Sequence, residues 1–241
     1  MSNILITGDE GFIGSRLSQV LQKQGHKVFG IDLKSGHDIL EADLPDNIDL
    51  AIHLAGRGGV RESMADPKAY WYINVEGTKR ILEKYKDIRV LVAGSSSQYE
   101  PHLNPYAASK HVIEKIPHSN VCFMRFHTVY GDVPRANMFF DKLLNNKLEY
   151  VTNHERDFIH IEDLMEAIQI LMKSDYTGTI DIGTGQTVRI SDIRPDLPIK
   201  EDTPGERIKT QANTEMMTEL GFKPKYTVKN FLTNKGFEHK L

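Results

Sequence analysis

Tyr106 and Lys110 lie four residues apart in the stretch PYAASK, a spacing that places both side chains on one face of a helix. A lysine ammonium beside a phenol favours the phenolate and lowers the phenol pKa from about 10 towards neutrality. A tyrosine in that state is a general base. Ordinary helix surface explains the pair equally well, so a neighbouring feature has to decide between the two interpretations.

The serine run in AGSSSQY, residues 93–99, is that feature. It ends an apolar stretch typical of a β-strand, and in an open α/β sheet ligands bind at the carboxyl ends of the strands. A cluster of hydroxyls there, followed by a helix that carries Tyr106 and Lys110, indicates a hydride-transfer site if a dinucleotide binds nearby.

A glycine-rich turn near the N-terminus predicts that dinucleotide. The segment TGDEGFIG, residues 7–14, has GxxGxxG spacing between a strand and a helix, where the helix N-terminus attracts a pyrophosphate. Asp32 ends the next strand and can accept hydrogen bonds from the adenosine ribose, which favours NAD over NADP. We expect Asp9 and Glu10, in the variable positions of the turn, to face solvent.

Alternating strands and helices must position these residues. Strands are predicted at residues 3–8, 27–32, 49–56, 89–96, 120–126 and 178–185. Helices are predicted at residues 12–25, 66–86, 104–116, 136–147 and 161–174. This alternation favours right-handed βαβ crossovers and a parallel sheet covered on both faces. The last fifty or so residues are rich in proline and charge, and we expect them to form a small lobe.

The bulk composition excludes several classes of function. A net charge of -3 offers no field for nucleic acid, and no apolar stretch reaches the ~20 residues of a membrane span. The single cysteine, Cys122, lies in an apolar run and is expected to be a buried core thiol. The histidines show no metal-ligand spacing, so no metal is expected. We expect a cytoplasmic protein without nucleic-acid or membrane partners.

These motifs together resemble a known family, the extended short-chain dehydrogenase/reductases, and within it the NAD-dependent nucleotide-sugar epimerases. The resemblance covers nearly the whole chain. TGDEGFIG is similar to the family's TGxxGxxG, HLAG (residues 53–56) to HLAA, YAASK to YxxxK, RDFIHIEDL (residues 156–164) to the RDF segment, and DIGTG (residues 181–185) to NxGxG.

The resemblance implies a fold and an assembly. The fold is α/β, a Rossmann-type doubly wound parallel sheet with a small C-terminal substrate-binding lobe. Residues 1–241 form one such unit, in which residues 1–130 and 155–185 make the NAD-binding core and residues 131–154 and 186–241 make the lobe. The family pairs two subunits through the helices at residues 68–86 and 105–116, which implies a homodimer.

The same resemblance assigns site residues. Ser95, four residues before Tyr99, is the implied catalytic hydroxyl beside Tyr106 and Lys110. The implied NAD contacts are Gly8, Gly11, Phe12, Ile13, Gly14, Asp32, Leu33, Asp38, Ile39, Leu54, Ala55 and Gly56, together with Tyr106 and Lys110. Asp43 and Leu44 are the alternative to Asp38 and Ile39 for the adenine contact.

Three further stretches, GGVRESMADPKAYWYINVEGT, RFHTVYGDVPRANM and TPGERIKTQANTEMMTELGFKPKYTV, resemble segments of UDP-glucuronate 4-epimerases. They imply substrate contacts at Arg61, Ser96, Ser97, Thr128, Arg135, Met138 and Arg156. Thr128 and Ser97 would lie near the carbon-5 substituent of the sugar, and Arg156 would meet the diphosphate, since a guanidinium fork suits phosphate. A surface salt bridge is the alternative role for each arginine.

Missing acids narrow the implied reaction. The family's dehydratases carry Asp-Glu directly after the catalytic hydroxyl, and its decarboxylases carry Glu at the position of Ser97; here Ser96 and Ser97 follow Ser95. Transient oxidation at C4 and return of the hydride to the other face, that is 4-epimerisation, is therefore expected, in the usual setting of surface-polysaccharide synthesis. A 4-keto-sugar reductase and a catalytically weak NAD-binding protein remain as alternatives.

The chain departs from the family in its length. The helix that normally follows the second strand is absent between Asp32 and residue 49, and the substrate loop after Tyr99 is reduced to EPHLN. His127 stands where the epimerases have an aromatic side chain. A shorter loop could widen the site and change which sugar fits.

Overall fold

The computed structural model describes residues 1–201 and 203–241, and they form two compact units. The first unit comprises Met1–Arg125 and Leu171–Ile180, and the second comprises Phe126–Ile170 and Asp181–Leu241. The chain thus leaves the first unit and returns to it once. Each unit has its own sheet and apolar core.

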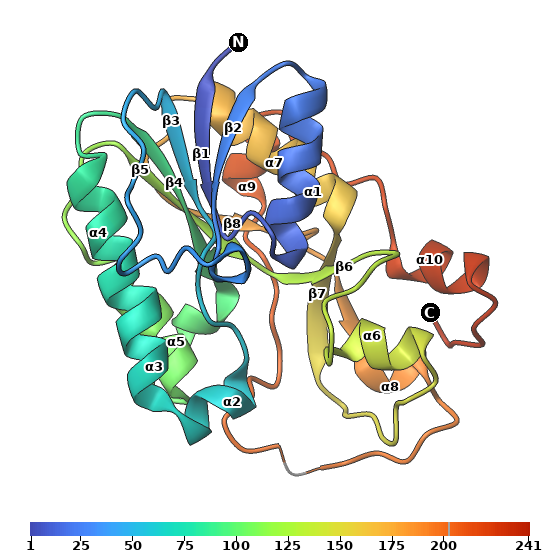
Figure 1. The fold of residues 1–241 in the computed structure, drawn as a ribbon. Helices are drawn as coiled ribbons and strands as arrows, with labels where there is room; N and C mark the ends of the chain where they lie inside the picture. The colour runs from blue at the N-terminus through green and yellow to red at the C-terminus, as the bar shows by residue number, and fades with distance from the viewer. Residues whose placement is uncertain (202) are drawn as a thin grey trace. The chain divides into compact units, whose positions relative to one another are not determined.

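A six-stranded sheet with the order β2-β1-β3-β4-β5-β8 organises the first unit (Figure 1). Its strands are β1 (Asn3–Thr7), β2 (Lys27–Ile31), β3 (Leu50–His53), β4 (Arg89–Ser95), β5 (Val121–Phe126) and β8 (Gly178–Ile182). β1 pairs in parallel with β2 and β3, and β3 pairs in parallel with β4. The predicted α/β fold with a parallel sheet is confirmed.

Helices cover both faces of this sheet. α1 (Phe12–Lys23) lies on one face, while α3 (Pro67–Trp71), α4 (Gly77–Lys84) and α5 (Pro105–Ile113) lie on the other (Figure 1). Side chains alternate along a strand, so Leu5 of β1 joins the core beneath α4 and α5 while its neighbours Ile4 and Ile6 face away from that core. Both faces are buried, as a parallel sheet requires.

The helix predicted at residues 66–86 is interrupted by one π-helical turn, η2 (Tyr72–Glu76), between α3 and α4. A π-turn widens the helix by one residue and is typical of functional positions. Here it carries the buried Asn74, whose side chain bonds to both the backbone N–H and the backbone C=O of Arg57. The short helix α2 (Val60–Ala65) begins three residues after Arg57. The sequence pattern does not predict this helix.

Only short turns separate β2 from β3, in agreement with the expected loss of a helix. A 3-10 turn, η1 (Leu33–Ser35), follows β2, and a second 3-10 turn, η3 (Ser96–Tyr99), follows β4. Cys122 of β5 is fully buried, as expected, and burial raises the pKa of its thiol to about 12.

The second unit is built on a three-stranded sheet of order β6-β7-β9. Its strands are β6 (Thr128–Tyr130), β7 (Glu155–His160) and β9 (Thr187–Arg189). Its helices are α6 (Phe139–Leu144), α8 (Ile190–Ile193), α9 (Glu215–Glu219) and α10 (Val228–Asn234), and α7 (Ile161–Lys173) begins here and ends in the first unit. The sequence pattern misses this sheet, because two of its strands are three residues long.

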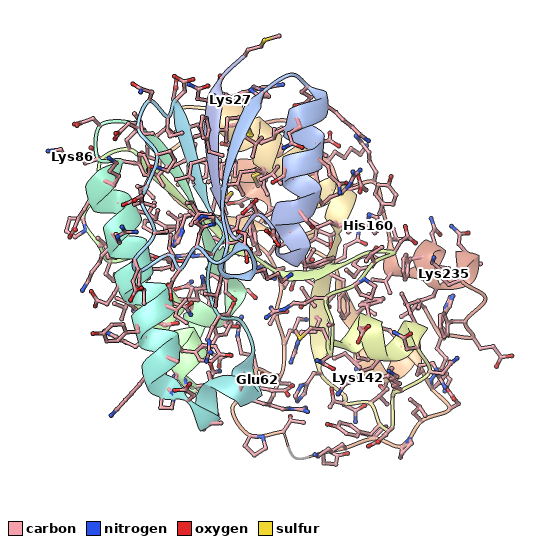
Figure 2. The ribbon with its side chains drawn as sticks, viewed as in Figure 1. Lys27, Glu62, Lys86, Lys142, His160 and Lys235 are labelled. Atoms are coloured by element: carbon pink, nitrogen blue, oxygen red, sulfur yellow. The ribbon has the colours of Figure 1, made fainter. Side chains whose placement is uncertain are left out.

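Aromatic side chains fill the core of the second unit. Tyr130 is fully buried and stacks on Phe140, with Phe158 and Phe231 packed edge-on against its ring. His160, labelled in Figure 2 at the end of β7, adds a further edge-on contact to Tyr130. No helix in the described residues has the length and apolarity of a membrane span.

Candidate active site

The turn between β1 and α1 leaves no room for a side chain at Gly8 or at Gly14. Gly8 adopts a positive φ of +73°, and a Cβ on it would lie 2.7 Å from the Ala55 backbone nitrogen. A Cβ on Gly14 would lie 2.0 Å from the Gly8 oxygen. Gly11 is the N-cap of α1 and supplies no side-chain cap to the first amides of this helix. The turn therefore presents backbone N–H groups at a helix N-terminus, which is an anion-binding arrangement.

Asp32 is fixed by backbone hydrogen bonds at the end of β2. Its carboxylate accepts from the Glu10 N–H at 3.0 Å and from the Lys34 N–H at 2.9 Å. Two backbone donors hold the carboxylate in one orientation, and its remaining lone pairs can accept from hydroxyls. The structure thus joins the glycine turn and the acid after β2, as the sequence predicts.

Asp9 corrects one expectation. Glu10 is exposed, as predicted, but the prediction that Asp9 faces solvent is wrong, because its Oδ1 atom is buried and has no hydrogen-bond partner. The carboxyl group lies against Gly30 of β2, where a Cβ would come within 2.0 Å of Oδ2. Burial and the nearby Asp32 and Glu10 charges raise the pKa of Asp9. The missing side chain at position 30 makes this position of Asp9 possible.

The remaining predicted cofactor residues differ in exposure. Leu33 is exposed and Asp38 is half-buried, whereas Ile39 belongs to the apolar core and contacts Gly77 at the start of α4. Phe12, Ile13, Leu54 and Ala55 are half-buried, and Gly56 is exposed. The Asp38 side chain accepts from the Leu40 N–H at 2.9 Å, which shapes the turn after η1.

The three predicted catalytic residues all belong to the first unit. Ser95 is the last residue of β4, and its hydroxyl accepts from the Ser97 N–H at 3.1 Å. η3, which begins at Ser96, packs against α5, the helix that carries Tyr106 and Lys110. Ser96 is buried and Ser97 half-buried. Tyr106 is half-buried, and its ring packs edge-on against Tyr70.

Lys110 is a buried cation that bonds to the neighbouring strand β4. Its Nζ donates to the Ala93 carbonyl of β4 at 2.7 Å. Burial lowers the pKa of Lys110 to about 8, against a small raising effect of Glu114. A lysine held this way keeps its positive charge near neutral pH and directs it within the water-poor space beside Tyr106.

A chain of hydrogen bonds fixes the strand ends around Lys110. The Ala55 N–H donates to Thr7 Oγ1, which contacts His53 Nδ1 at 2.6 Å, and His53 Nε2 contacts Thr78 Oγ1 at 3.1 Å. Thr78 donates to the Asn74 carbonyl at 2.6 Å. Since Thr78 uses its hydroxyl proton there, it must accept from His53 Nε2–H, and in the neutral imidazole Nδ1 then accepts from Thr7.

The imidazole pKa agrees with this tautomer. Burial, with a smaller contribution from the Lys110 charge, lowers the pKa of His53 to about 3. This histidine is a structural bridge between β1, β3 and α4, whose Thr78 in turn bonds the π-turn at Asn74. Sequence reasoning missed the roles of Thr7, Asn74 and Thr78, although all three lie in the quoted motifs.

The predicted substrate residues lie in both units. Arg61 lies on α2 of the first unit, near Glu62, which is labelled in Figure 2. Ser96 and Ser97 also belong to the first unit, and the second unit holds the remaining four: Thr128 in β6, Arg135 in the segment before α6, Met138 as the N-cap of α6, and Arg156 in β7. Arg61, Arg135 and Met138 are exposed, whereas Thr128 and Arg156 are half-buried.

Arg156 is held by its neighbours. Its guanidinium donates to the carbonyls of Glu155 and Ile208 and to His154 Nδ1, and Glu206 lies 3.7 Å away. Burial lowers the Arg156 pKa, and Glu206 opposes this effect. Glu206 and His154 are site residues that sequence reasoning missed.

Asp157, the next residue of β7, organises three segments of the second unit. It is fully buried and accepts four hydrogen bonds, from the Thr184 N–H and hydroxyl, the Gly185 N–H and the Ala212 N–H, at 2.8 to 3.1 Å. The aspartate of the RDF segment thus anchors the DIGTG loop, and its charge is compensated by donors rather than by a cation.

His127 and Asp181 form a second buried pair in this unit. His127 Nε2 lies 3.4 Å from Asp181 Oδ2, which also accepts from the Asn213 N–H at 3.0 Å. The other ring nitrogen of His127 is buried without a hydrogen-bond partner. The described residues contain no cluster of metal-binding side chains.

The chain's own residues fit a dinucleotide. A Cβ on Gly8 or Gly14 would collide with the protein's own backbone, so glycine at these positions allows the tight turn that precedes the N-terminus of α1. Asp32 offers the acceptor for a ribose, and Lys110 supplies a cation beside Gly56. These residues all belong to the first unit.

Comparison with known proteins agrees with this geometry. A UDP-glucuronate 4-epimerase from Thermodesulfobacterium geofontis (strain OPF15) is 26% identical, with 77% of this chain and 76% of that protein covered. The structure of UDP-glucuronic acid 4-epimerase from Bacillus cereus in complex with UDP-glucuronic acid and NAD superposes with a TM-score of 0.83 at 27% identity, covering 97% of both chains.

MoeE5, solved in complex with UDP-glucose and NAD, is similarly close, with a TM-score of 0.86 at 27% identity and 97% of both chains covered. These neighbours are similar to the chain over nearly its full length, and each was solved with NAD bound. The sequence model of the NAD dependent epimerase/dehydratase family matches residues 4–183. The chain therefore belongs to the NAD dependent epimerase/dehydratase family, as a short member whose cofactor is NAD.

Proposed function

We propose that this protein is an NAD-dependent nucleotide-sugar 4-epimerase that acts on UDP-glucuronate or a closely related UDP-sugar. One observation carries the proposal: Tyr106 and the buried Lys110 share α5, beside the strand end that bears Ser95. Relatives of the same family that are named UDP-glucuronate 4-epimerases support the substrate class.

Each catalytic residue has a chemical role at the C4 hydroxyl. The Tyr106 phenolate takes the hydroxyl proton, and Ser95 donates a hydrogen bond to the same oxygen. Lys110 stabilises the phenolate by its positive charge and would hold the nicotinamide ribose. NAD, when bound, supplies a nicotinamide ring that accepts a hydride and gives it back. The sugar becomes a 4-keto sugar, and after it rotates Tyr106 returns the proton while C4 receives hydride on its other face.

The residues after Ser95 support epimerisation over elimination. A dehydratase needs an acid and a base beside the 4-keto sugar. Here Ser96 is buried and has no ionisable group, and the Ser97 N–H donates to the Ser95 hydroxyl. Two hydroxyls at these positions provide no general base for proton abstraction at carbon 5.

Two residues of the second unit would select the sugar nucleotide. Arg156 presents a guanidinium to the diphosphate, and Thr128 offers a hydroxyl to a carboxylate on carbon 5. A Thr128→Val variant tests the second role, because valine keeps the branched shape of threonine and lacks the hydroxyl. We expect its kcat/KM for UDP-glucuronate to fall by about tenfold, the effect of one lost hydrogen bond to a charged group, with little change for UDP-glucose.

The proposed activity is tested by turnover without added cofactor. Purified protein is examined for bound NAD and incubated with UDP-glucuronate, UDP-glucose and UDP-N-acetylglucosamine, and the products are resolved by NMR. We expect C4 inversion of at least one sugar, abolished in Tyr106→Phe. The matched control is Tyr226→Phe, which alters an exposed tyrosine of the second unit and keeps its ring stacked on His160.

The competing functions give different results in the same experiment. If the protein consumes NADPH in the presence of a 4-keto sugar, it is a reductase and not an epimerase. Tight NAD binding without turnover of any of the three sugars would leave a binding protein. Either result would contradict the proposal.

We further propose a homodimer formed through residues 68–86 and 105–116. Trp71 and Tyr72 support this assembly, since these adjacent residues at the junction of α3 and η2 are 44% and 63% exposed. Large exposed aromatic side chains are enriched at interfaces. Light scattering coupled to gel filtration should give twice the chain mass, and a Trp71→Glu, Tyr72→Glu double variant should give the monomer.

A further inference from the structure

His154, directly before β7, lies among polar partners in the second unit. Its side chain is 10% exposed, and its Nδ1 atom is 3.1 Å from an Arg156 guanidinium nitrogen and 3.6 Å from the Glu206 carboxylate. Its Nε2 atom is 3.1 Å from the Thr203 hydroxyl. Both ring nitrogens therefore have polar neighbours. Nδ1 has two of opposite charge, the Arg156 guanidinium and the Glu206 carboxylate.

The contact with Arg156 defines the protonation state. A guanidinium only donates hydrogen bonds, so Nδ1 must be an acceptor, and the single ring proton lies on Nε2, which donates to Thr203. In this neutral form His154 holds one nitrogen of Arg156 in place. The Ile208 and Glu155 carbonyls hold the other terminal nitrogen.

The protonated form would pair differently. A proton on Nδ1 cannot coexist with the bond from Arg156, and it would instead point to Glu206. Among the described residues, the charged groups that act on His154 are Arg156 on β7 and Glu206 on the segment after Thr203, and Arg207 lies close enough to act on Arg156. Burial and the Arg156 charge lower the His154 pKa, while Glu206 raises it.

The neighbouring charges on β7 form a separate group. Glu155 pairs with Lys209 and Arg189, and successive side chains of a strand point to opposite faces. The cluster of His154, Arg156, Thr203 and Glu206 is thus neutral overall when the histidine is neutral, and carries one positive charge when it is protonated.

We propose that His154 is a positioning residue for Arg156, and that binding of a diphosphate at Arg156 is coupled to uptake of one proton by His154. The inference rests on the proposed function, which places the diphosphate at Arg156. In the neutral form Arg156 is shared with His154. Proton uptake moves His154 to Glu206, releases the Arg156 nitrogen to the anion, and adds a positive charge beside it.

The sign of the pH dependence follows from linkage. A bound diphosphate favours the charged imidazole, so the His154 pKa is higher in the complex than in the free protein. The complex is then stabilised as pH falls, and affinity weakens as pH rises through the pKa of the complex. A difference of one unit between the two pKa values corresponds to about a tenfold change in Kd.

Calorimetric titration with UDP-glucose tests the coupling, because the charge of this probe is constant between about pH 5.5 and pH 8.5. Titrations in two buffers of different ionisation enthalpy give the number of protons taken up. For the wild-type chain we expect net proton uptake and affinity up to about tenfold tighter at the lower pH.

His154→Gln separates the roles, since glutamine can accept from Arg156 and donate to Thr203 but does not titrate. We expect this variant to keep the wild-type affinity at the higher pH and to lose both the proton uptake and the pH dependence. His154→Phe should bind UDP-glucose weakly at both pH values. The matched control is His118→Gln, in the turn between α5 and β5 of the other unit.

Two outcomes overturn the inference at different levels. If the wild-type chain binds UDP-glucose but His154→Gln retains the same proton uptake, the coupling belongs to another group and the inference fails alone. If the wild-type chain binds no UDP-glucose at either pH, the proposed function fails and the inference fails with it.

Discussion

Replacing Lys110 with methionine should stabilise the free protein while it destroys turnover. The chain keeps this ammonium group buried with one hydrogen bond to the Ala93 carbonyl. Its pKa falls from 10.5 to about 8, and at 1.36 kcal/mol per unit the charged form costs the fold about 3 kcal/mol. The lost hydrogen bond offsets about 1 kcal/mol of the gain. A net gain of about 2 kcal/mol corresponds to a rise in Tm of about 4–8 °C for a chain of this size.

The dependence of this gain on pH identifies its cause. Below the folded pKa of about 8, Lys110 is charged in both states and the cost of burial is complete. Between about 8 and 10.5 the folded chain releases the proton while the unfolded chain keeps it, so wild-type stability rises with pH. The advantage of Lys110→Met should therefore shrink across this range and vanish at its upper end.

Urea denaturation at about pH 7 and pH 10 measures the effect, on protein shown by absorbance to be free of nucleotide. Lys115→Met, which removes an exposed lysine just beyond α5, is the control and should change stability by less than about 0.5 kcal/mol. Turnover of Lys110→Met should fall by about 10²–10⁴-fold. A variant that is less stable than wild type at neutral pH, or equally stabilised at both pH values, would refute the reasoning.

Three further predictions concern single carboxylates and one histidine. As the pH falls from 6.5 to about 5, the wild-type chain should lose about 2 kcal/mol of unfolding free energy relative to His53→Gln. The reason is that the unfolded chain binds a proton at this histidine, whereas the buried imidazole, with its pKa of about 3, stays unprotonated. Equal pH slopes in urea titrations of the two proteins would contradict this. Asp157→Asn replaces the carboxylate that accepts four hydrogen bonds with an amide, whose NH2 group would face donors, and should lower the unfolding free energy by about 3 kcal/mol. An unchanged urea midpoint would count against the anchoring role of Asp157. Asp32→Ala should weaken NAD binding by about tenfold or more and NADP binding less, measured by calorimetry; a preserved preference for NAD would show that another group selects the cofactor.

Periodicity and turn chemistry were sufficient to predict most of the first unit, with α2 and the π-turn as the exceptions. β1, β2, β4 and β5 are apolar runs with turn residues at their ends, and α1 and α5 begin after residues suited to helix starts. The same rules fail in the second unit, where β6 and β9 are three residues long and show no period. Their pairing to β7 depends on residues that are far away in the sequence.

The candidate site shows the same division. Tyr106 and Lys110 could be predicted as neighbours because a helix fixes their spacing. Local spacing contains no information about the partners of Arg156, since Glu206 lies fifty residues later in an irregular segment. Asp9 was misjudged for a related reason: its space depends on Gly30, a residue of the next strand.

The position of β8 has a consequence for synthesis of the chain. β8 pairs with β5 at the edge of the six-stranded sheet, although about fifty residues of the second unit separate the two strands in the sequence. While a ribosome makes those residues, the apolar β5 (Val121–Phe126) is the last strand of an incomplete sheet, and an open apolar edge promotes aggregation. A nascent chain that stalls after β5 should therefore need a chaperone, and release should follow only once residues 178–182 have emerged.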